Sequence, residues 1–402
     1  MNLGAQAVGE PVDHVPLAEA VDFAHDRPNR WPDDIPFLGM NELPDSALYA
    51  DCWRLLTRPE IKSGVPVRNG DLLVAKITPC FENGKQGIVR DLPDEWGYAT
   101  TEVHRLRARS HVDIGYVAYW LRRSDTRKRL ADAMEGTTGR QRLPRAALEK
   151  ELIGLPSLDE QRRIVRILST IQQCRDATHA VTDAARTLIA ALSTRCFADL
   201  DGVSTRLGDI ADVKGGKRLP KGHPFADNTT QFPYIRIVDF LNGSVDVANL
   251  KYLSSEDHQA IQRYVIRADD VYISIAGSVG LAGTVPQVLD GANLTENAAR
   301  IVIRDSTIVT NRFVYWYLAS EFGQAEIRLR ATRTSQPKLA LGRIADIPIT
   351  IPPIKQQEVV VSRLDTAQAR LIANQRLVDA LEVTFASTLT TLFRGCDRDP
   401  RL

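Results

Sequence analysis

Two polar, basic loops of this chain combine cations with amide and hydroxyl side chains. The first loop reads TTGRQRLPR, from Thr137 to Arg145, and the second reads RTSQPKLAL, from Arg333 to Leu341. Lys and Arg can bind phosphate groups, whereas Gln, Asn, Ser and Arg can form hydrogen bonds with base edges. This combination favours a surface that binds a ligand shared by both loops, and a polyanion is the simplest candidate.

The segments around these loops are strongly basic, although the chain as a whole is balanced, with 51 Lys and Arg, 50 Asp and Glu, and a net charge of +1. Arg122 to Arg145 holds eight basic residues against three acids, and Arg328 to Arg343 holds five with no acid. Lys214 to His223 holds four with no acid. A charge run is usually only a solvated face, but recurrence at equivalent positions favours a shared ligand.

The candidate DNA-binding residues fall into three groups. They are Arg140, Gln141, Arg142 and Arg145 in the first loop, Thr334, Ser335, Gln336 and Lys338 in the second, and Lys217, Arg218 and Lys221 in KGGKRLPKGH. We expect Lys338 to contact phosphate and Gln336 to read one base pair.

The motifs of an enzyme are missing from the chain. Neither phosphate-binding glycine signature occurs, and GSVGLAG at Gly277 to Gly283 has the wrong spacing and is better interpreted as a strand turn. The seven histidines show no metal-ligand spacing. We find no N/D-P-P-Y/F motif of amino-methyltransferases and no nuclease constellation. We therefore expect no catalytic activity, cofactor or metal in this chain, and a self-contained methyltransferase or nuclease is disfavoured.

The chain repeats itself once. Tyr116–Phe197 aligns with Arg312–Phe393 without a gap and with 18 identical pairs in 82. The anchors of the match are LPSLDEQRRIVRIL, from Leu155, IPPIKQQEVVVSRL, from Ile351, and the aromatic pairs Tyr119, Trp120, Tyr315 and Trp316. The aromatic pairs lie on helical faces, so we expect them to pack in cores rather than stack on bases. A period this long indicates a duplicated domain with pseudo-two-fold symmetry.

A long helix should end each copy. Both segments lack Gly and Pro and carry an apolar stripe at steps of three, four and seven residues. The stripe comprises Ile164, Leu168, Ile171, Cys174, Val181, Ala185, Leu188, Leu192 and Cys196 in the first copy, and Val360, Leu364, Ala367, Leu371, Leu377, Leu381, Phe385 and Leu392 in the second. Because such stripes must be covered, we expect the helices to pair as an antiparallel coiled coil. Alternatively, each helix packs on its own domain.

The predicted fold class is α+β: two mixed α/β domains related by pseudo-two-fold symmetry and joined by two long helices that form an antiparallel coiled coil. The expected boundaries are 1–156 for the first domain, 157–198 for the first helix, 199–352 for the second domain, 353–394 for the second helix and 395–402 for a tail.

These features resemble the DNA specificity subunit of type I restriction-modification systems, over about Val15 to Phe393. LPSLDEQRRIVRIL and IPPIKQQEVVVSRL are similar to the helix entries of that family. TRLGDIADVKGGKRLP, with its Gly-Gly turn, is similar to the start of a family domain, and DDVYISIAGSVG is similar to its strand-and-turn core. The first domain differs, because LAEAVDFAHDRPNR has no Gly-Gly turn and KITPCFENGKQG replaces the usual short Gly-Ser turn.

The resemblance implies that each mixed domain is a target recognition domain that reads one half of a bipartite DNA site. The helices would set the unread spacer and dock two modification subunits, and restriction subunits would join the complex. S-adenosylmethionine, ATP and Mg²⁺ would be used by these partners in DNA methylation and phage defence, while the specificity subunit itself is not an enzyme.

Two alternatives remain open. The chain could be the specificity subunit of a related methylation or phage-defence assembly, or a protein-binding coiled-coil scaffold that does not touch nucleic acid. No apolar run approaches the ~18 residues of a membrane span, and the N-terminus lacks the pattern of a signal peptide. A cytoplasmic protein without a membrane partner is therefore expected.

Overall fold

The structure is a computed structural model, and it describes residues 12–137, 139–198, 200–332, 336–394 and 396. The chain divides into two compact units. Unit 1 comprises Met1–Thr178 and Leu377–Leu402, and unit 2 comprises His179–Arg376. Two long helices, α5 (Leu158–Ala198) and α11 (Ile354–Arg394), each contribute one half to each unit.

Unit 1 is built from short strands and helices that lead into α5. Its elements are β1 (Asp13–Pro16), α1 (Leu17–Ala20), β2 (Val21–Phe23), β3 (Asp34–Leu38), β4 (Tyr49–Ala50), β5 (Arg54–Thr57), η1 (Arg58–Glu60), β6 (Val65–Arg68), β7 (Leu72–Ala75), β8 (Gln86–Val89), β9 (Trp96–Ala99), β10 (Val103–Ala108), α2 (Ile114–Arg122), α3 (Ser124–Asp132), β11 (Glu135–Thr137), β12 (Arg140–Arg142), α4 (Arg145–Lys150) and β13 (Leu152–Leu155). The strands form sheets in the orders β2-β10-β7-β8-β4 and β5-β3-β9-β6, with the pairs β1-β13 and β11-β12.

Unit 2 follows the same plan before α11. Its elements are β14 (Val203–Arg206), α6 (Leu207–Ile210), β15 (Ala211–Gly215), β16 (Pro233–Ile235), η2 (Ile237–Asp239), β17 (Phe240–Leu241), β18 (Ser244–Val245), β19 (Lys251–Tyr252), α7 (Ser255–Ile261), η3 (Gln262–Tyr264), β20 (Val265–Ile266), β21 (Val271–Ser274), β22 (Ala282–Thr284), η4 (Gln287–Leu289), β23 (Ala292–Leu294), β24 (Ala298–Ile303), α8 (Asn311–Ala319), α9 (Glu321–Arg330), α10 (Leu341–Ala345) and β25 (Pro348–Ile351). The sheet orders are β15-β24-β21-β22 and β19-β16-β23-β20, with the pairs β14-β25 and β17-β18.

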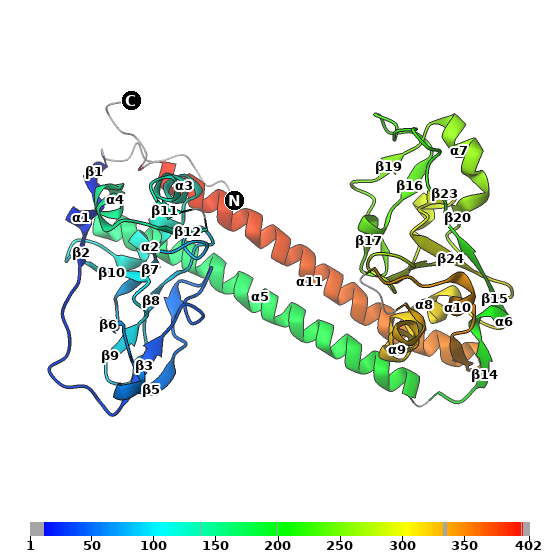
Figure 1. Cartoon of the computed structure of the whole chain (residues 1–402), viewed down its shortest axis with the longest axis horizontal. Helices are drawn as coiled ribbons and strands as arrows, with labels where there is room; N and C mark the ends of the chain where they lie inside the picture. The colour runs from blue at the N-terminus through cyan, green and yellow to red at the C-terminus, as the bar shows by residue number, and fades with distance from the viewer. Residues whose placement is uncertain (1–11, 138, 199, 333–335, 395, 397–402) are drawn as a thin grey trace. The chain divides into compact units, whose positions relative to one another are not determined.

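The duplication extends to strand register. Val103 of β10 pairs with Ala75 at the end of β7, and Ala298 of β24 pairs in the same way with Ser274 at the end of β21. In the second sheet of each unit, β3 pairs in parallel with β9, and β16 pairs in parallel with β23. The predicted α+β class and the doubled mixed domain are therefore confirmed (Figure 1).

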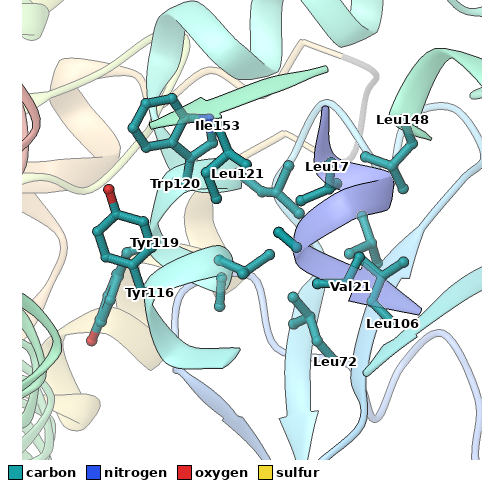
Figure 2. Close-up of a cluster of buried hydrophobic side chains, with 14 of the residues drawn as sticks. Leu17, Val21, Leu72, Leu106, Tyr116, Tyr119, Trp120, Leu121, Leu148 and Ile153 are labelled. Carbon is teal, nitrogen blue, oxygen red and sulfur yellow. The ribbon is translucent and has the colours of Figure 1, made fainter. Parts of the chain in front are cut away.

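The main core of unit 1 lies between its five-stranded sheet and α2. All four residues of β7 are buried because both faces of the strand are covered: Leu72 belongs to this core and Leu73 to a second hydrophobic cluster on the other face. Figure 2 shows part of the cluster and labels Leu17, Val21, Leu72, Leu106, Tyr116, Tyr119, Trp120, Leu121, Leu148 and Ile153. Tyr119 and Trp120 are buried here, and Tyr315 and Trp316 are buried in unit 2. The prediction that these aromatic pairs pack in cores is confirmed.

A buried glutamine joins unit 1 to the start of α5. Gln161 donates hydrogen bonds from Nε2 to the carbonyl oxygens of Pro156 (2.8 Å) and His111 (3.3 Å). Its Oε1 accepts a hydrogen bond from the backbone N–H of Asp113 (2.9 Å), whose carboxylate caps α2. One amide group therefore fixes α2 against the entry to α5.

The same clamp recurs in unit 2. Gln357 donates from Nε2 to the carbonyl oxygens of Pro352 (2.9 Å) and Ile308 (2.8 Å), and its Oε1 accepts from the backbone N–H of Thr310 (3.0 Å). Thr310 caps α8. The spacing of proline and glutamine that anchors the sequence match thus has a structural cause, because both glutamines hold a helix cap to a long helix.

A second glutamine in each long helix ties down a distal loop. In unit 1, Tyr119 donates from its hydroxyl to Oε1 of Gln172 (3.3 Å), and Gln172 donates to a backbone carbonyl between β3 and β4. In unit 2, Gln368 donates to the hydroxyl of Tyr315 (2.9 Å) and to the carbonyl of Asn242 (2.6 Å), which lies between β17 and β18. In each unit, a long helix therefore holds this loop as well as the helix cap described above.

The two long helices lie side by side and antiparallel within each unit (Figure 1). In unit 1, Arg175 forms an ion pair with Glu382 (Nη1–Oε2 3.3 Å), and in unit 2, Arg186 donates to Oε1 of Gln375 (2.8 Å). The shared hydrophobic cores contain Ile164 and Leu168 with Leu389 and Phe393 in unit 1, and Phe197 with Val360 and Leu364 in unit 2. Residues later in α5 therefore contact residues earlier in α11, as expected for antiparallel helices.

The predicted apolar stripe was wrong in the middle of the helices. Val181 and Leu188 are 55% and 65% exposed, and Leu377 is 50% exposed. The buried positions near them are largely polar, namely Gln172, Arg175, Thr182 and Ser193 on α5. Periodicity identified the buried face of each helix from its apolar residues, so it missed the buried positions that carry polar side chains. Among the described residues, no helix is long and apolar enough to cross a membrane.

Candidate nucleic-acid interface

Both units place a cation at one equivalent backbone position. In unit 1 the segment after β7 forms an isolated antiparallel bridge between Ile77 and Arg142. In unit 2 the segment after β21 forms the same bridge between Ala276 and Lys338. Arg142 and Lys338 are 196 positions apart (338 − 142), the offset of the sequence repeat. The backbone therefore confirms that the two basic loops occupy the same place in the fold.

In unit 1 this position belongs to a hairpin, β11-β12. Arg140 and Arg142 alternate with Gln141 along β12, so the two arginines share one face and Gln141 lies on the other. Both arginines are exposed, whereas Gln141 is half-buried and its backbone carbonyl accepts from the N–H of Thr78 (3.1 Å). The arginine face is thus the solvent face of the hairpin.

Arg142 is held by a carboxylate. It donates from Nε and Nη2 to Oε2 and Oε1 of Glu102, both at 3.0 Å. The hydrogen bond from Arg142 is the largest reason that the pKa of Glu102 lies below its usual value, and burial acts in the opposite direction. The pair is a forked, charge-assisted contact at the surface.

Arg145 is engaged within unit 1. Its Nε donates to Oε1 of Glu149 (2.7 Å), its Nη1 lies 2.9 Å from Nε2 of His25, and its guanidinium lies 4.5 Å from the centre of the Phe23 ring. These contacts hold α4 beside β2. The structure therefore does not bring Arg145 onto the arginine face of β12.

The basic segment of unit 2 begins at a glycine that must approach another strand closely. A Cβ on Gly216 would lie 2.1 Å from the carbonyl oxygen of Thr295, just before β24. Only glycine fits at this position, which explains Gly216, whereas a Cβ on Gly215 would make an ordinary contact with Leu341 at 3.6 Å. Unit 1 lacks the turn because β2 ends at Phe23, which pairs with Leu106, whereas β15 continues to Gly215.

The three basic side chains that follow these glycines differ in the contacts that hold them. Arg218 forms an ion pair with Glu296 (Nε–Oε1 2.6 Å), and the ammonium of Lys217 lies 5.6 Å from the centre of the Tyr264 ring. Lys221 is exposed, and no acid within 4.0 Å pairs with it in the described parts of the chain. Of these three, Lys221 is the least constrained by the fold.

Lys338 is exposed on the loop after α9. Its backbone N–H donates to Oγ1 of Thr332 (2.9 Å), and its carbonyl accepts from the N–H of Thr332 (2.9 Å). Over the residues that the structure describes, no carboxylate pairs with its ammonium group. Gln336 is also exposed, whereas Thr334 and Ser335 lie outside the described residues.

The two segments that carry the candidate DNA-binding residues of unit 2 lie at one end of the sheet β15-β24-β21-β22. Gly215 pairs with Ala299 near the start of β24, and Ser274 at the end of β21 pairs with Ala298. The segment that follows β15 and the loop that bridges to Lys338 therefore leave the sheet at the same end. The structure brings together two segments that lie more than a hundred residues apart in the sequence.

Sequence reasoning missed the carboxylate partner of Arg142. Glu102 and Asn297 occupy equivalent positions, because their carbonyl oxygens accept from the N–H groups of Lys76 (3.0 Å) and Ile275 (2.8 Å). They are 195 positions apart (297 − 102), one fewer than the offset of the repeat. An alignment that allowed this slip upstream of α2 would pair Glu102 with Asn297, whereas the contact of Glu102 with Arg142, 40 residues away, arises from the tertiary fold.

Comparison with known proteins identifies the family. The model described as "Type I restriction modification DNA specificity domain" matches residues 24–184 and again residues 201–382. The two matches together cover most of the chain, and one falls on each copy of the duplicated domain.

Curated relatives match over different lengths. The type I restriction enzyme EcoAI specificity subunit of Escherichia coli is 34% identical over 129 residues, which are 31% of this chain and 22% of that protein. The EcoEI subunit of the same organism is 33% identical over 33% of this chain and 24% of its own length, so these matches span about a quarter or less of either relative. The StySPI specificity subunit of Salmonella potsdam is 25% identical over 90% of this chain and 82% of its own length.

Solved structures share the fold. The S subunit of a type I restriction-modification system from M. genitalium superposes with a TM-score of 0.61 at 15% identity, covering 96% of this chain and 98% of that one. A chain from a study of type I R-M complex assembly and conformational transition gives a TM-score of 0.57 at 17% identity, covering 97% and 99%. With both domain copies matched, this chain belongs to the type I restriction-modification DNA specificity domain family.

Proposed function

We propose that this chain is the DNA specificity subunit of a type I restriction-modification complex, in which each unit reads one half of a bipartite site. The observation that carries the proposal is the cation at one repeated backbone position, Arg142 in unit 1 and Lys338 in unit 2. A protein that presents a cation at the same place in each of two domains is suited to two half-sites. Membership of the family in two domain copies supports the same assignment.

In this proposal the long helices set the length of DNA left unread between the half-sites, on the order of one helical turn, or ~10 bp. They also dock the modification subunits, of which the duplication favours two, and restriction subunits complete the complex. Exposed apolar side chains on the helices support a docking role, and they are Val181, Leu188, Val359, Leu377 and Val383. Exposed apolar side chains on long helices are suited to a protein partner.

The chemistry would belong to the partners. Methylation of a base inside a duplex requires the base to be flipped out into a pocket, and recognition can then reside on a separate chain. S-adenosylmethionine, ATP and Mg²⁺ are assigned to the modification and restriction subunits. This chain would be non-catalytic and would supply sequence selection, for DNA methylation and for defence against phage.

Competition binding tests the proposal. The chain assembled with its modification subunit is offered a labelled mixture of random duplexes of 20 to 40 bp against individual competitors at several salt concentrations. We expect strong preference for a minority of sequences and affinity that falls with salt, since neutralising Z phosphates gives a log-log slope of about −0.9Z. A complex that prefers no sequence contradicts the proposal. Binding of a partner that does not depend on salt instead favours the alternative of a protein-binding coiled-coil scaffold.

Replacement of Lys338 with alanine should weaken binding to all duplexes by a similar factor. The ammonium is exposed and unpaired among the described residues, so it is available to a phosphate rather than to a particular base. Loss of one phosphate contact should make the salt slope shallower by about 0.9. Lys355→Ala, at an exposed position near the start of α11, is the matched control. A change in the preferred sequence, with the slope unaltered, contradicts the phosphate assignment.

A further inference from the structure

The hairpin β11-β12 is an element of a kind that can read DNA. It is a two-stranded ribbon in which Glu135 pairs with Arg142 and Thr137 pairs with Arg140. All of β11 is exposed, as are both arginines of β12. The major groove of B-DNA admits a two-stranded β-ribbon, and a ribbon of this kind presents alternate side chains of one strand to the base edges.

The ion pair with Glu102 leaves one specific edge of the Arg142 guanidinium available. The carboxylate takes the Nε–Nη2 edge, with both distances at 3.0 Å. No described residue accepts a hydrogen bond from Nη1, so the Nη1–Nη2 edge still carries two parallel N–H groups. That edge matches the O6 and N7 acceptors of guanine, which is the most frequent specific base contact of arginine.

Glu102 also removes most of the freedom of that side chain. Arg142 is 59% exposed, and a long exposed arginine would otherwise sample many rotamers. The carboxylate, 27% exposed and anchored just before β10, holds the plane of the guanidinium before DNA arrives. A contact that is ordered in advance loses less entropy on binding and discriminates better.

From this geometry we propose that Arg142, positioned by Glu102, reads a guanine in the major groove of the half-site bound by unit 1. The inference rests on the proposed function and adds the base, the groove and the positioning residue. Unit 2 carries Lys338 and Asn297 at the equivalent positions, so it has no guanidinium fork there. The two halves of the site therefore differ at this point, and the guanine belongs to one half only.

The test compares charge-conserving variants in the complex with the modification subunit. Arg142→Lys keeps the cation but lacks the planar fork, and we expect its preference for one guanine in one half-site to fall on the order of ten- to hundred-fold. Glu102→Gln should relax the same position to a smaller extent while the fold is retained. Arg90→Lys is the matched control and should keep the guanine, because Arg90 is an exposed arginine of unit 1 that pairs with Asp51 (2.7 Å) outside the basic loop.

Modified bases assign the contact to atoms. Substitution of that guanine by 7-deazaguanine removes N7, so it should weaken the wild-type complex but have little further effect on Arg142→Lys. Equal sensitivity of both proteins to 7-deazaguanine overturns the inference, and so does an Arg142→Lys complex that prefers the same sequence as the wild type. In either case, a sequence preference of the wild-type complex shows that the proposed function still holds. A wild-type complex with no sequence preference overturns the proposed function together with this inference.

Discussion

Replacement of Asp71 with alanine is expected to lower the free energy of unfolding of unit 1 by about 3–5 kcal/mol. The Asp71 side chain is fully buried at the turn between β6 and β7. Its Oδ2 accepts from Nε of Arg105 (2.5 Å) and its Oδ1 from Nε of Arg107 (2.9 Å), and the backbone N–H of Arg68 donates to it at 2.8 Å. The Arg105 side chain is 2% exposed, and its other ion-pair partner, the Asp26 carboxylate (2.7 Å), is 42% exposed, so loss of Asp71 removes its buried counter-charge.

Chemical denaturation followed by circular dichroism measures this effect. Asp22→Ala is the matched control, because Asp22 lies on β2 of the same sheet and its ion pair with Arg109 (3.2 Å) is exposed. The control should cost less than about 1 kcal/mol, as exposed ion pairs do. If the two variants unfold at the same denaturant concentration, the buried network does not hold the sheet.

The second large effect is expected for Gln357→Leu, with a loss of about 2–4 kcal/mol in unit 2. Leucine has nearly the same size but makes none of the three hydrogen bonds of Gln357. It leaves the N–H of Thr310 and the carbonyl oxygens of Pro352 and Ile308 without their partner. Each buried polar group left unsatisfied costs about 1–3 kcal/mol.

Gln356→Leu provides the control for this prediction. Gln356 is the preceding residue of the same helix and its side chain is exposed, so the same substitution should change stability by less than about 0.5 kcal/mol. Thermal unfolding of both variants, monitored at the first transition, gives the comparison. Similar melting temperatures for the two variants would show that the repeated glutamine does not clamp α8 to α11.

The repeated architecture could be predicted because both copies keep the same residue types at the same spacing. The P-x-x-x-x-Q segments recur since Gln161 and Gln357 must each satisfy the same two carbonyls and one N–H. The helix seam could be predicted only in part. Periodicity places Val181 on the buried face, but the buried neighbour is Thr182, and hydrophobicity alone does not detect a polar residue in a seam.

The candidate interface was predictable in position but not in detail. The offset of the repeat placed Arg142 and Lys338 at equivalent positions, and the isolated β-bridges of the two units show the same equivalence. Arg145 lies in the same basic run, yet it is held by Glu149 and His25. The contact with His25 depends on the tertiary fold, because His25 lies 120 residues away in the sequence.

Selection from a random duplex library by the complete complex, followed by sequencing of the bound DNA, tests the central claim most directly. The account predicts two fixed blocks of sequence separated by an unread spacer of constant length, and Arg142→Lys should alter only one block. A single continuous motif, or two blocks whose separation varies from one bound duplex to another, would contradict it.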